Sequence, residues 1–259
     1  MKILKNPEKV EAFWKSLENG RMNRLLMLDY DGTLAPFVVD RYKAYPYPWV
    51  RFILAQILQD KRNRVVIISG RNAKEVKALL GQKLPIEIWG GHGTERLLPS
   101  GELIREPVPS WAKGIFGQVE DWATDRNLLD CIEEKHGCLA FHVRGLEGGK
   151  VQGLLDDATQ FFKKVSKGSD LQTETFDGGV ELRLKGVDKG KVVRKLVSEV
   201  PANTASSYYG DDYTDEDAFV ALGEEGVSFL VRQEFRKTKA DVWIVPPDEL
   251  KECLSRYIL

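Results

Sequence analysis

The sequence contains few of the residues that build disulfide frameworks or bind soft metals. There are 3 Cys and 3 His among its 259 residues. Cys131, Cys138 and Cys253 show no C-x-x-C spacing. An odd number of scattered thiols argues against a disulfide framework, and no Cys/His cluster indicates a structural zinc site. We therefore expect reduced cysteines and a cytoplasmic protein.

A charge excess and long apolar runs are also missing. Lys and Arg number 38 against 39 Asp and Glu, which gives a net charge of −1. Without a basic excess we expect no nucleic-acid partner and no membrane surface. The sequence shows neither a leader peptide nor a run of transmembrane length. We expect a globular monomer, with an oligomer left open.

A short apolar run that ends in two carboxylates is the most informative feature present. Leu25–Leu28 predicts a strand buried on both faces, and Asp29 and Asp31 follow it before a turn at Gly32. Two carboxylates at close range resist joint ionisation, so a cation or a raised pKa has to compensate. The alternative interpretation of this stretch alone is a strand and a turn, with one carboxylate capping the backbone.

Helices and strands alternate in the first and last parts of the chain. The patterns predict helices over 7–18, 48–59, 73–80, from about 189 and over 248–257, and strands over 25–28, 65–68, 86–89, 206–209, 227–231 and 242–245. Asn72 and Gly81 fit the two caps of the helix at 73–80. This alternation predicts an α/β fold with a parallel sheet covered by helices.

The pattern changes in the middle of the chain. Residues 105–185 predict a helix over 111–126, a hairpin of strands 131–135 and 139–144, a helix over 151–165, and a second hairpin of strands 171–176 and 180–184. These elements are typical of a small α+β domain inserted into the first one.

Polar residues lie where predicted strands end or helices begin: Asp29, Asp31, Ser69, Lys189, Asp211, Asp212 and Asp215. Ligands of open parallel sheets bind beyond the carboxyl ends of the strands, so we expect these side chains to lie together. Carboxylate oxygens suit Mg²⁺, and Lys189 suits a phosphate. Thr214 and Asp217 resemble a capping box, which leaves Asp211 and Asp212 unexplained.

Four segments in this order resemble the motifs of the haloacid-dehalogenase-like phosphohydrolase superfamily: Asp29-Tyr30-Asp31-Gly32-Thr33, Ser69-Gly70-Arg71, Lys189, and Gly210-Asp211-Asp212-x-x-Asp215. Others are similar to segments of trehalose-6-phosphate phosphatases: Gly90-Gly91-His92-Gly93, Phe141-His142-Val143-Arg144, Lys185-Gly186-Val187-Asp188-Lys189-Gly190, and the run 211–219. The resemblance extends over the whole chain. It implies a Rossmann-like parallel-sheet core at 1–104 and 186–259, with an inserted α+β cap domain at 105–185 that selects the substrate.

The resemblance also implies roles for individual residues. Asp29 would attack phosphorus to form an aspartyl-phosphate, and Asp31 would act as acid and then base. Ser69 and Lys189 would hold phosphoryl oxygens. The implied Mg²⁺ ligands are Asp29, the backbone carbonyl of Asp31 and Asp211, with Asp212 and Asp215 acting partly through waters. The expected substrate contacts are Gly70, Arg71, His92 and Gly93 in the core and Glu133, Lys135, Arg144 and Glu181 in the cap.

The activity implied is Mg²⁺-dependent hydrolysis of trehalose 6-phosphate by a stand-alone phosphatase. The alternative is a related phosphatase acting on glucosylglycerol phosphate, mannosyl-3-phosphoglycerate or sucrose phosphate, which would have the same catalytic residues. For the charged residues of the cap hairpins, the alternative interpretation is that they are simply solvated. A phosphomutase is disfavoured because the stretch from Asp29 to Ser69 is already filled by a loop, a helix and the start of a strand. A receiver-like signalling protein is disfavoured by Asp31 and by the insertion.

Overall fold

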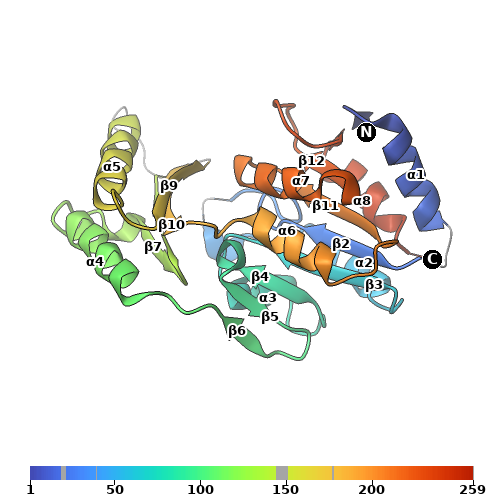
Figure 1. Cartoon of the computed structure of the whole chain (residues 1–259), viewed down its shortest axis with the longest axis horizontal. Helices are drawn as coiled ribbons and strands as arrows, with labels where there is room; N and C mark the ends of the chain where they lie inside the picture. Colours follow the sequence, from blue (N-terminus) through green and yellow to red (C-terminus); the bar gives the residue numbers. More distant parts are fainter. Residues whose placement is uncertain (19–21, 39, 144–150, 177, 259) are drawn as a thin grey trace. The chain divides into compact units, whose positions relative to one another are not determined.

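The computed structural model describes residues 1–18, 22–38, 40–143, 151–176 and 178–258. These residues fall into two compact units, each with a sheet of its own (Figure 1). Unit 1 comprises Met1–Ile104 and Asp188–Leu259, and unit 2 comprises Arg105–Val187.

The sheet of unit 1 has the strand order β1-β13-β12-β11-β2-β3-β4-β5-β6. The strands are β1 (Lys2–Ile3), β2 (Arg24–Leu28), β3 (Asn63–Ile68), β4 (Glu87–Gly90), β5 (Glu95–Leu97), β6 (Leu103–Arg105), β11 (Ala205–Gly210), β12 (Gly226–Val231) and β13 (Val242–Ile244). All pairs from β13 to β4 are parallel, whereas β1 pairs antiparallel with β13 and β5 pairs antiparallel with β4. The predicted α/β fold with a parallel central sheet is confirmed.

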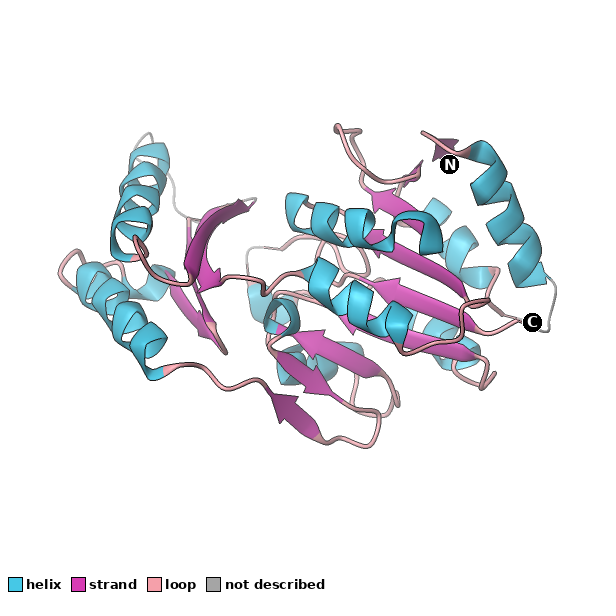
Figure 2. Cartoon of the chain, viewed as in Figure 1, coloured by secondary structure: helices cyan, strands magenta, loops and turns pink. Residues whose placement is uncertain are grey.

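Helices cover both faces of this sheet (Figure 2). They are α1 (Pro7–Glu18), α2 (Val50–Ile57), α3 (Ala73–Leu80), α6 (Lys189–Ser198), α7 (Glu216–Leu222) and α8 (Asp248–Ser255). Because side chains alternate along a strand, β2 contributes to both interiors. Leu26 and Leu28 pack with α1, α2, α3 and α8, while Leu25 and Met27 pack with α6 and α7.

Sequence patterns missed the short edge strands and assigned one capping box to the wrong residues. Strands β1, β5 and β6 have two or three residues each, too few to show a period. Asn72 stands at the N-cap of α3, but its side chain makes no capping hydrogen bond. The capping box predicted for Thr214 and Asp217 is wrong, because Asp212 and Asp215 form it, around the 3₁₀ turn η4 (Tyr213–Asp215).

Unit 2 packs two helices against one face of a four-stranded antiparallel sheet. The helices are α4 (Ser110–Thr124) and α5 (Val151–Val165), and the strand order is β7 (Ile132–Lys135), β8 (Cys138–His142), β10 (Gly179–Leu184), β9 (Leu171–Phe176). The helix-covered core includes Leu139, Phe141, Val180 and Leu182. The alternate residues of these strands therefore lie on the opposite face.

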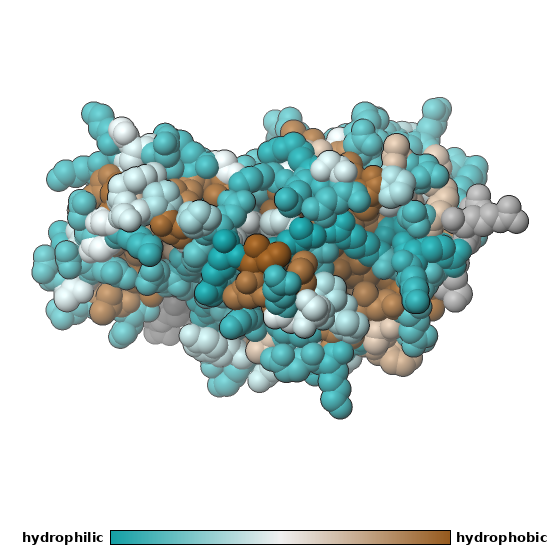
Figure 3. All heavy atoms as spheres, turned by 60° about the horizontal axis from the view of Figure 1, so that its bottom comes forward, coloured by the Kyte–Doolittle hydropathy of each residue, from teal (hydrophilic) through white to brown (hydrophobic). Residues whose placement is uncertain are grey.

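The face of the molecule drawn in Figure 3 is mostly hydrophilic, with smaller hydrophobic areas between the polar side chains. None of the helices formed by the described residues has the length and apolar character needed to cross a membrane.

Candidate active site

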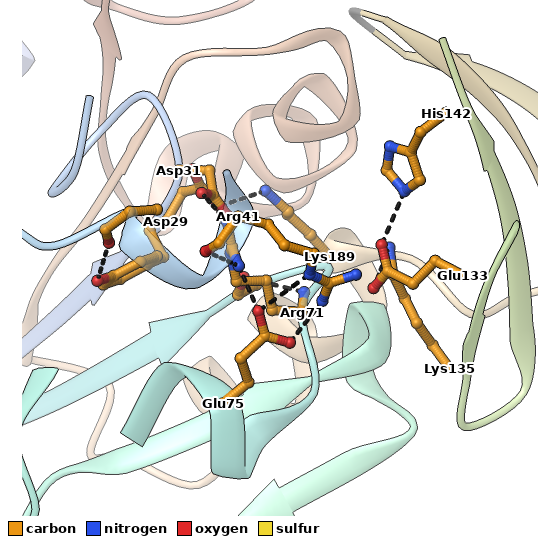
Figure 4. A network of polar contacts seen from close by, with 12 residues as sticks. Asp29, Asp31, Arg41, Arg71, Glu75, Glu133, Lys135, His142 and Lys189 are labelled. Atoms are coloured by element: carbon orange, nitrogen blue, oxygen red, sulfur yellow. Dashed lines mark hydrogen bonds and ion pairs between the residues drawn. The ribbon is translucent and has the colours of Figure 1, made fainter. Parts of the chain in front are cut away.

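Asp29 lies at the carboxyl end of β2, inside the protein. Its backbone N–H donates to the Tyr209 carbonyl of the neighbouring strand β11 at 2.8 Å, and the residue is only 4% exposed. The Lys189 ammonium donates to its Oδ1 atom at 2.7 Å (Figure 4). Burial is the main reason that the pKa of Asp29 is raised, to about 7, although Lys189 opposes the shift. Ionised Asp29 therefore depends on positive charge close by.

Lys189 joins Asp29 to Asp215, which lies after β11. Its ammonium also donates to Asp215 Oδ1 at 2.7 Å. Lys189 is the first residue of α6, and Asp188 caps this helix by accepting from the Lys191 N–H at 2.6 Å. Burial alone would lower the pKa of Lys189, but Asp215 and Asp29 outweigh it and the pKa is raised. Lys189 is therefore a permanently charged, fixed cation.

Asp215 uses both of its carboxylate oxygens within the protein. Besides Lys189, the Tyr208 hydroxyl donates to Oδ1 at 2.5 Å. The backbone N–H groups of Asp211 and Asp212 donate to Oδ2 at 3.0 Å each. Asp215 thus holds the loop that carries Asp211, while Asp212 caps η4.

Asp211 has the properties of a metal ligand. It is buried, and burial together with the charge of Asp29 raises its pKa well above the ordinary value. Its Oδ2 atom has no hydrogen-bond partner among the described residues. Carboxylate oxygens of Asp29, Asp211 and Asp215 lie within 4.8 Å of one another. A hard divalent cation such as Mg²⁺ fits this donor set, because it would satisfy the open oxygen and offset the repulsion.

A close backbone approach brings the two motifs together. Gly32 has φ +80°, and a side-chain carbon there would collide with the Asp211 carboxylate. A glycine is therefore required at the turn that follows Asp31.

Asp31 belongs to a second, adjoining network (Figure 4). The Arg71 guanidinium donates from Nε to Asp31 Oδ2 at 2.6 Å and from Nη2 to Oδ1 at 2.8 Å. Arg71 also donates to the Arg41 carbonyl at 2.9 Å and to Glu75, which in turn binds the side chain of Arg41. The carboxylate of Asp31 is thus directed at Arg71 instead of joining the Asp29 cluster.

Ser69 and the His92 turn lie at the ends of the next two strands. Ser69 Oγ accepts from the Arg71 N–H at 3.1 Å, and its carbonyl accepts from the His92 N–H at 3.1 Å. His92 and Gly93 belong to the 3₁₀ turn η2 (Gly91–Gly93), in which His92 has φ +55°. Gly70 lets the His92 ring approach, since a side-chain carbon there would come within 2.6 Å of Nε2.

The residues expected to contact a sugar lie in unit 2. Register places Glu133, Ala140, Glu181 and Glu174 in one row across the face away from the helices. Glu133 accepts from His142 at 2.7 Å and lies 3.6 Å from the Lys135 ammonium (Figure 4). Glu181 is buried and accepts from Arg183 at 3.1 Å. Arg144 lies outside the described residues.

Sequence reasoning missed Tyr208, Arg41 and Glu75. Tyr208 carried a usable signal, because a hydroxyl in a wholly buried strand needs a partner. Arg41 and Glu75 carried none, since charged residues in a loop and on a helix are usually solvated.

Comparison with known proteins agrees with these motifs. A family model described as trehalose-phosphatase matches residues 27–242, which include all the core site residues above. The chain belongs to the trehalose-phosphatase family. Among its relatives are a trehalose-phosphatase of Schizosaccharomyces pombe, 31% identical over 208 residues, and a trehalose-phosphate phosphatase of Mycobacterium marinum, 31% identical over 219 residues. These alignments cover 77% and 80% of this chain, but 25% and 53% of the relatives.

Two solved structures share the fold of this chain. The C-terminal domain of Candida albicans trehalose-6-phosphate phosphatase superposes with a TM-score of 0.79 at 22% identity, covering 99% of this chain and 97% of that one. The C-terminal domain of a Candida albicans trehalose synthase regulatory protein gives 0.73 at 13% identity, covering 99% of both chains. These likenesses establish the fold and leave the activity to be argued from the site.

Proposed function

We propose that this chain is a Mg²⁺-dependent phosphatase that hydrolyses trehalose 6-phosphate to trehalose and phosphate. The observation that carries the proposal is the buried Asp29, with one carboxylate oxygen bound to Lys189, beside an Asp211 oxygen that has no hydrogen-bond partner among the described residues. Membership of the trehalose-phosphatase family and the printed names of its relatives support the substrate.

In the first step, Asp29 attacks phosphorus. Because Lys189 occupies Oδ1, we assign the attack to Oδ2. The bond between phosphorus and the sugar oxygen breaks, and that oxygen takes a proton from Asp31 in its acid form. In the second step Asp31, now a carboxylate, takes a proton from the water that attacks phosphorus. The bond between phosphorus and Asp29 Oδ2 breaks, phosphate leaves, and the Asp29 carboxylate and the Asp31 acid are restored. Lys189 and Ser69 hold phosphoryl oxygens, which carry the charge of the transition state.

Arg71 controls when Asp31 can act. Its two hydrogen bonds occupy both oxygens of the Asp31 carboxylate. Proton transfer to the sugar oxygen requires this ion pair to open, and a substrate phosphate is a competing anion for the guanidinium. Binding of the phosphate to Arg71 would therefore free the Asp31 carboxylate to take up a proton from solvent, which it then donates to the sugar oxygen.

Asp29 and Asp211 would hold the metal, with the Asp31 carbonyl as a third ligand and Asp212 and Asp215 contributing through water. Bound Mg²⁺ supplies the positive charge that keeps the raised-pKa carboxylates ionised and screens the phosphate from them. Unit 2 would act as the cap that selects the sugar, through Glu133, Lys135, Glu181 and Arg144.

Phosphate release from a substrate panel tests the proposal. The panel contains trehalose 6-phosphate, sucrose 6-phosphate, glucosylglycerol phosphate, mannosyl-3-phosphoglycerate and glucose 6-phosphate, each with Mg²⁺ and with excess chelator. We expect release from trehalose 6-phosphate that chelator abolishes. Preference for another sugar phosphate would retain the mechanism and reject the substrate, and no release from any would favour a regulatory role.

Glu181→Gln tests the role of unit 2. The amide removes the charge that accepts sugar hydroxyl hydrogen bonds, so kcat/KM for trehalose 6-phosphate should fall about 100-fold while that for a small aryl phosphate stays within about threefold. Glu134→Gln is the matched control, because Glu134 is exposed and lies in the row on the helix-covered face. Equal losses on both substrates would remove Glu181 from the sugar site.

A further inference from the structure

The loop that carries Asp211 and Asp212 is fastened by an arginine that the mechanism above does not use. Arg236 lies in the connection between β12 and β13. Its guanidinium donates to the Asp211 carbonyl from Nε and Nη2, at 3.3 Å each, and to the Asp212 carbonyl from Nη2 at 2.7 Å. These are charge-assisted bonds to two successive peptide groups of the metal loop.

Each of these peptide groups is held at both of its ends. The Asp211–Asp212 peptide presents its carbonyl to Arg236 and its N–H to Asp215 Oδ2 at 3.0 Å. The Asp212–Tyr213 peptide presents its carbonyl to Arg236 and its N–H to Asp212 Oδ1 at 2.7 Å. Since the Asp211 N–H also donates to Asp215, the Asp211 side chain leaves the backbone between two fixed peptide planes. Only its own side-chain rotations remain to direct the carboxylate.

Arg236 is itself fixed in place. Glu216, in the first turn of α7, accepts from its Nη1 and also from Thr238 Oγ1 at 2.8 Å and the Lys239 N–H at 2.7 Å. The Tyr213 ring covers the guanidinium at 4.6 Å. The guanidinium is thus held on one side by a carboxylate and on another by an aromatic ring, which leaves it little freedom.

We propose that Arg236 is a positioning residue for the divalent cation, acting by fixing the backbone from which the Asp211 carboxylate is directed toward Asp29. The inference rests on the proposed Mg²⁺-dependent function. In this role Arg236 acts through the Asp211 and Asp212 carbonyls to which it donates. Glu216 holds Arg236 in the orientation that this role needs.

Mg²⁺ binding to the full-length chain tests the proposal independently of turnover. In isothermal titration with MgCl₂, the Kd of Arg236→Ala should be at least about tenfold higher than the Kd of the wild type. Arg236→Lys should bind with an intermediate Kd, because one ammonium replaces a planar fork that reaches both carbonyls. In phosphate release, the Mg²⁺ concentration for half-maximal rate should rise in the same order, and kcat at saturating Mg²⁺ should fall by a smaller factor.

Arg256→Ala is the matched control. Arg256 also stacks on an aromatic ring, Trp14 at 4.0 Å, and pairs with Glu18, but it does so away from the metal loop. We expect its Mg²⁺ Kd to equal that of the wild type. Wild-type affinity in both Arg236 variants, or equal weakening in the control, would overturn the proposal, as would failure of the wild type to bind Mg²⁺.

The two proposals fail in different ways. If the wild-type chain binds Mg²⁺ and Arg236→Ala weakens binding, but no sugar phosphate is hydrolysed, the proposed phosphatase function is wrong and the positioning role of Arg236 stands. Glu216→Gln adds a second route to the same result, because it loosens Arg236 without altering any residue that faces the cation.

Discussion

Strand β2 carries a buried charge at each end, and the two ends differ in how that charge is balanced. At the amino end, Arg24 donates to Asp60 at 3.4 Å, to Asn63 at 3.1 Å and to the Leu17 carbonyl at 3.2 Å. At the carboxyl end, three carboxylates lie close together, those of Asp29, Asp211 and Asp215. Lys189 is the cation that pairs with Asp29 and Asp215 there. At the first end the buried cation has a carboxylate partner and further hydrogen bonds, whereas the second end has more carboxylates than cations.

This difference separates stability from function. Buried charge that is paired and hydrogen-bonded within the protein holds the fold together. A buried group of carboxylates in which one oxygen has no hydrogen-bond partner among the described residues needs a bound cation to balance its charge. Substitutions at the carboxyl end should therefore impair turnover while the fold remains. Substitutions at the amino end should lower the stability of the fold while kcat remains.

Asp29→Asn should have the largest effect on turnover. The amide cannot form an acyl-phosphate, so phosphate release should fall by more than about 10³-fold on trehalose 6-phosphate and on an aryl phosphate alike. Removing one of three crowded carboxylates relieves repulsion, so the free energy of unfolding in excess chelator should stay within about 1 kcal/mol of wild type. Measurable multiple turnover by the purified variant would contradict the nucleophile assignment.

Asp31→Asn, also at the carboxyl end of β2, should separate formation of the aspartyl-phosphate from its hydrolysis. An acidic phenol leaves without a proton donor, so an aryl phosphate should give a burst of phenol close to one equivalent of enzyme. Further turnover should then be slower by about 10²-fold or more, because water lacks its base. Rapid-quench measurement of phenol and phosphate checks this. A steady state at the wild-type rate without a burst would remove Asp31 from acid–base chemistry.

Arg24→Ala should show the opposite pattern. It removes a wholly buried guanidinium and leaves Asn63 and the Leu17 carbonyl without its hydrogen bonds, so we expect a loss of about 3 kcal/mol in urea unfolding. kcat below the melting transition should not change. Arg24→Met, which keeps the apolar stem, should lose less. A stable Arg24→Ala variant with a lowered kcat would break the division between the two ends.

Sequence alone predicted that Asp29, Lys189, Asp211 and Asp215 would lie together, and the reason is topological. Parallel strands bring their carboxyl ends to one edge, so polar residues that directly follow buried strands, such as Asp29 and Asp211, meet whatever their separation in sequence. The amino end had no comparable signal. Arg24 reads as a charged residue before a strand, and only the folded chain reveals that Asn63 and Leu17 surround it.

Pairings between side chains were beyond the reach of sequence patterns. Arg71 was expected to contact substrate, but nothing in its spacing indicated that it would hold Asp31 with two hydrogen bonds. No motif in the sequence singled out Arg236, although it donates to the carbonyls of the loop that carries Asp211 and Asp212. The capping box failed for a local reason: Thr214 and Asp217 fit the motif, but a 3₁₀ turn begins earlier, at Tyr213, so Asp212 and Asp215 form the box. Local patterns identify the elements, and long-range contacts decide the partners.

Asp60→Asn should have the smallest effect, and its pH dependence sharpens the account of the amino end. Hydrogen bonds from Arg62 are the main cause that lowers the pKa of Asp60, and Arg24 contributes less. A carboxylate with a lowered folded-state pKa stabilises the protein above its unfolded pKa of about 3.9, and this contribution is lost as the pH falls further. Because the ion pair of Asp60 with Arg62 is partly exposed, we expect the variant to lose at most about 1 kcal/mol at pH 7 in urea unfolding, with the difference shrinking below about pH 3.9. A larger loss, or one that persists at low pH, would mean that Arg24 depends on the charge of Asp60, and not mainly on its burial and its bonds to Asn63 and Leu17.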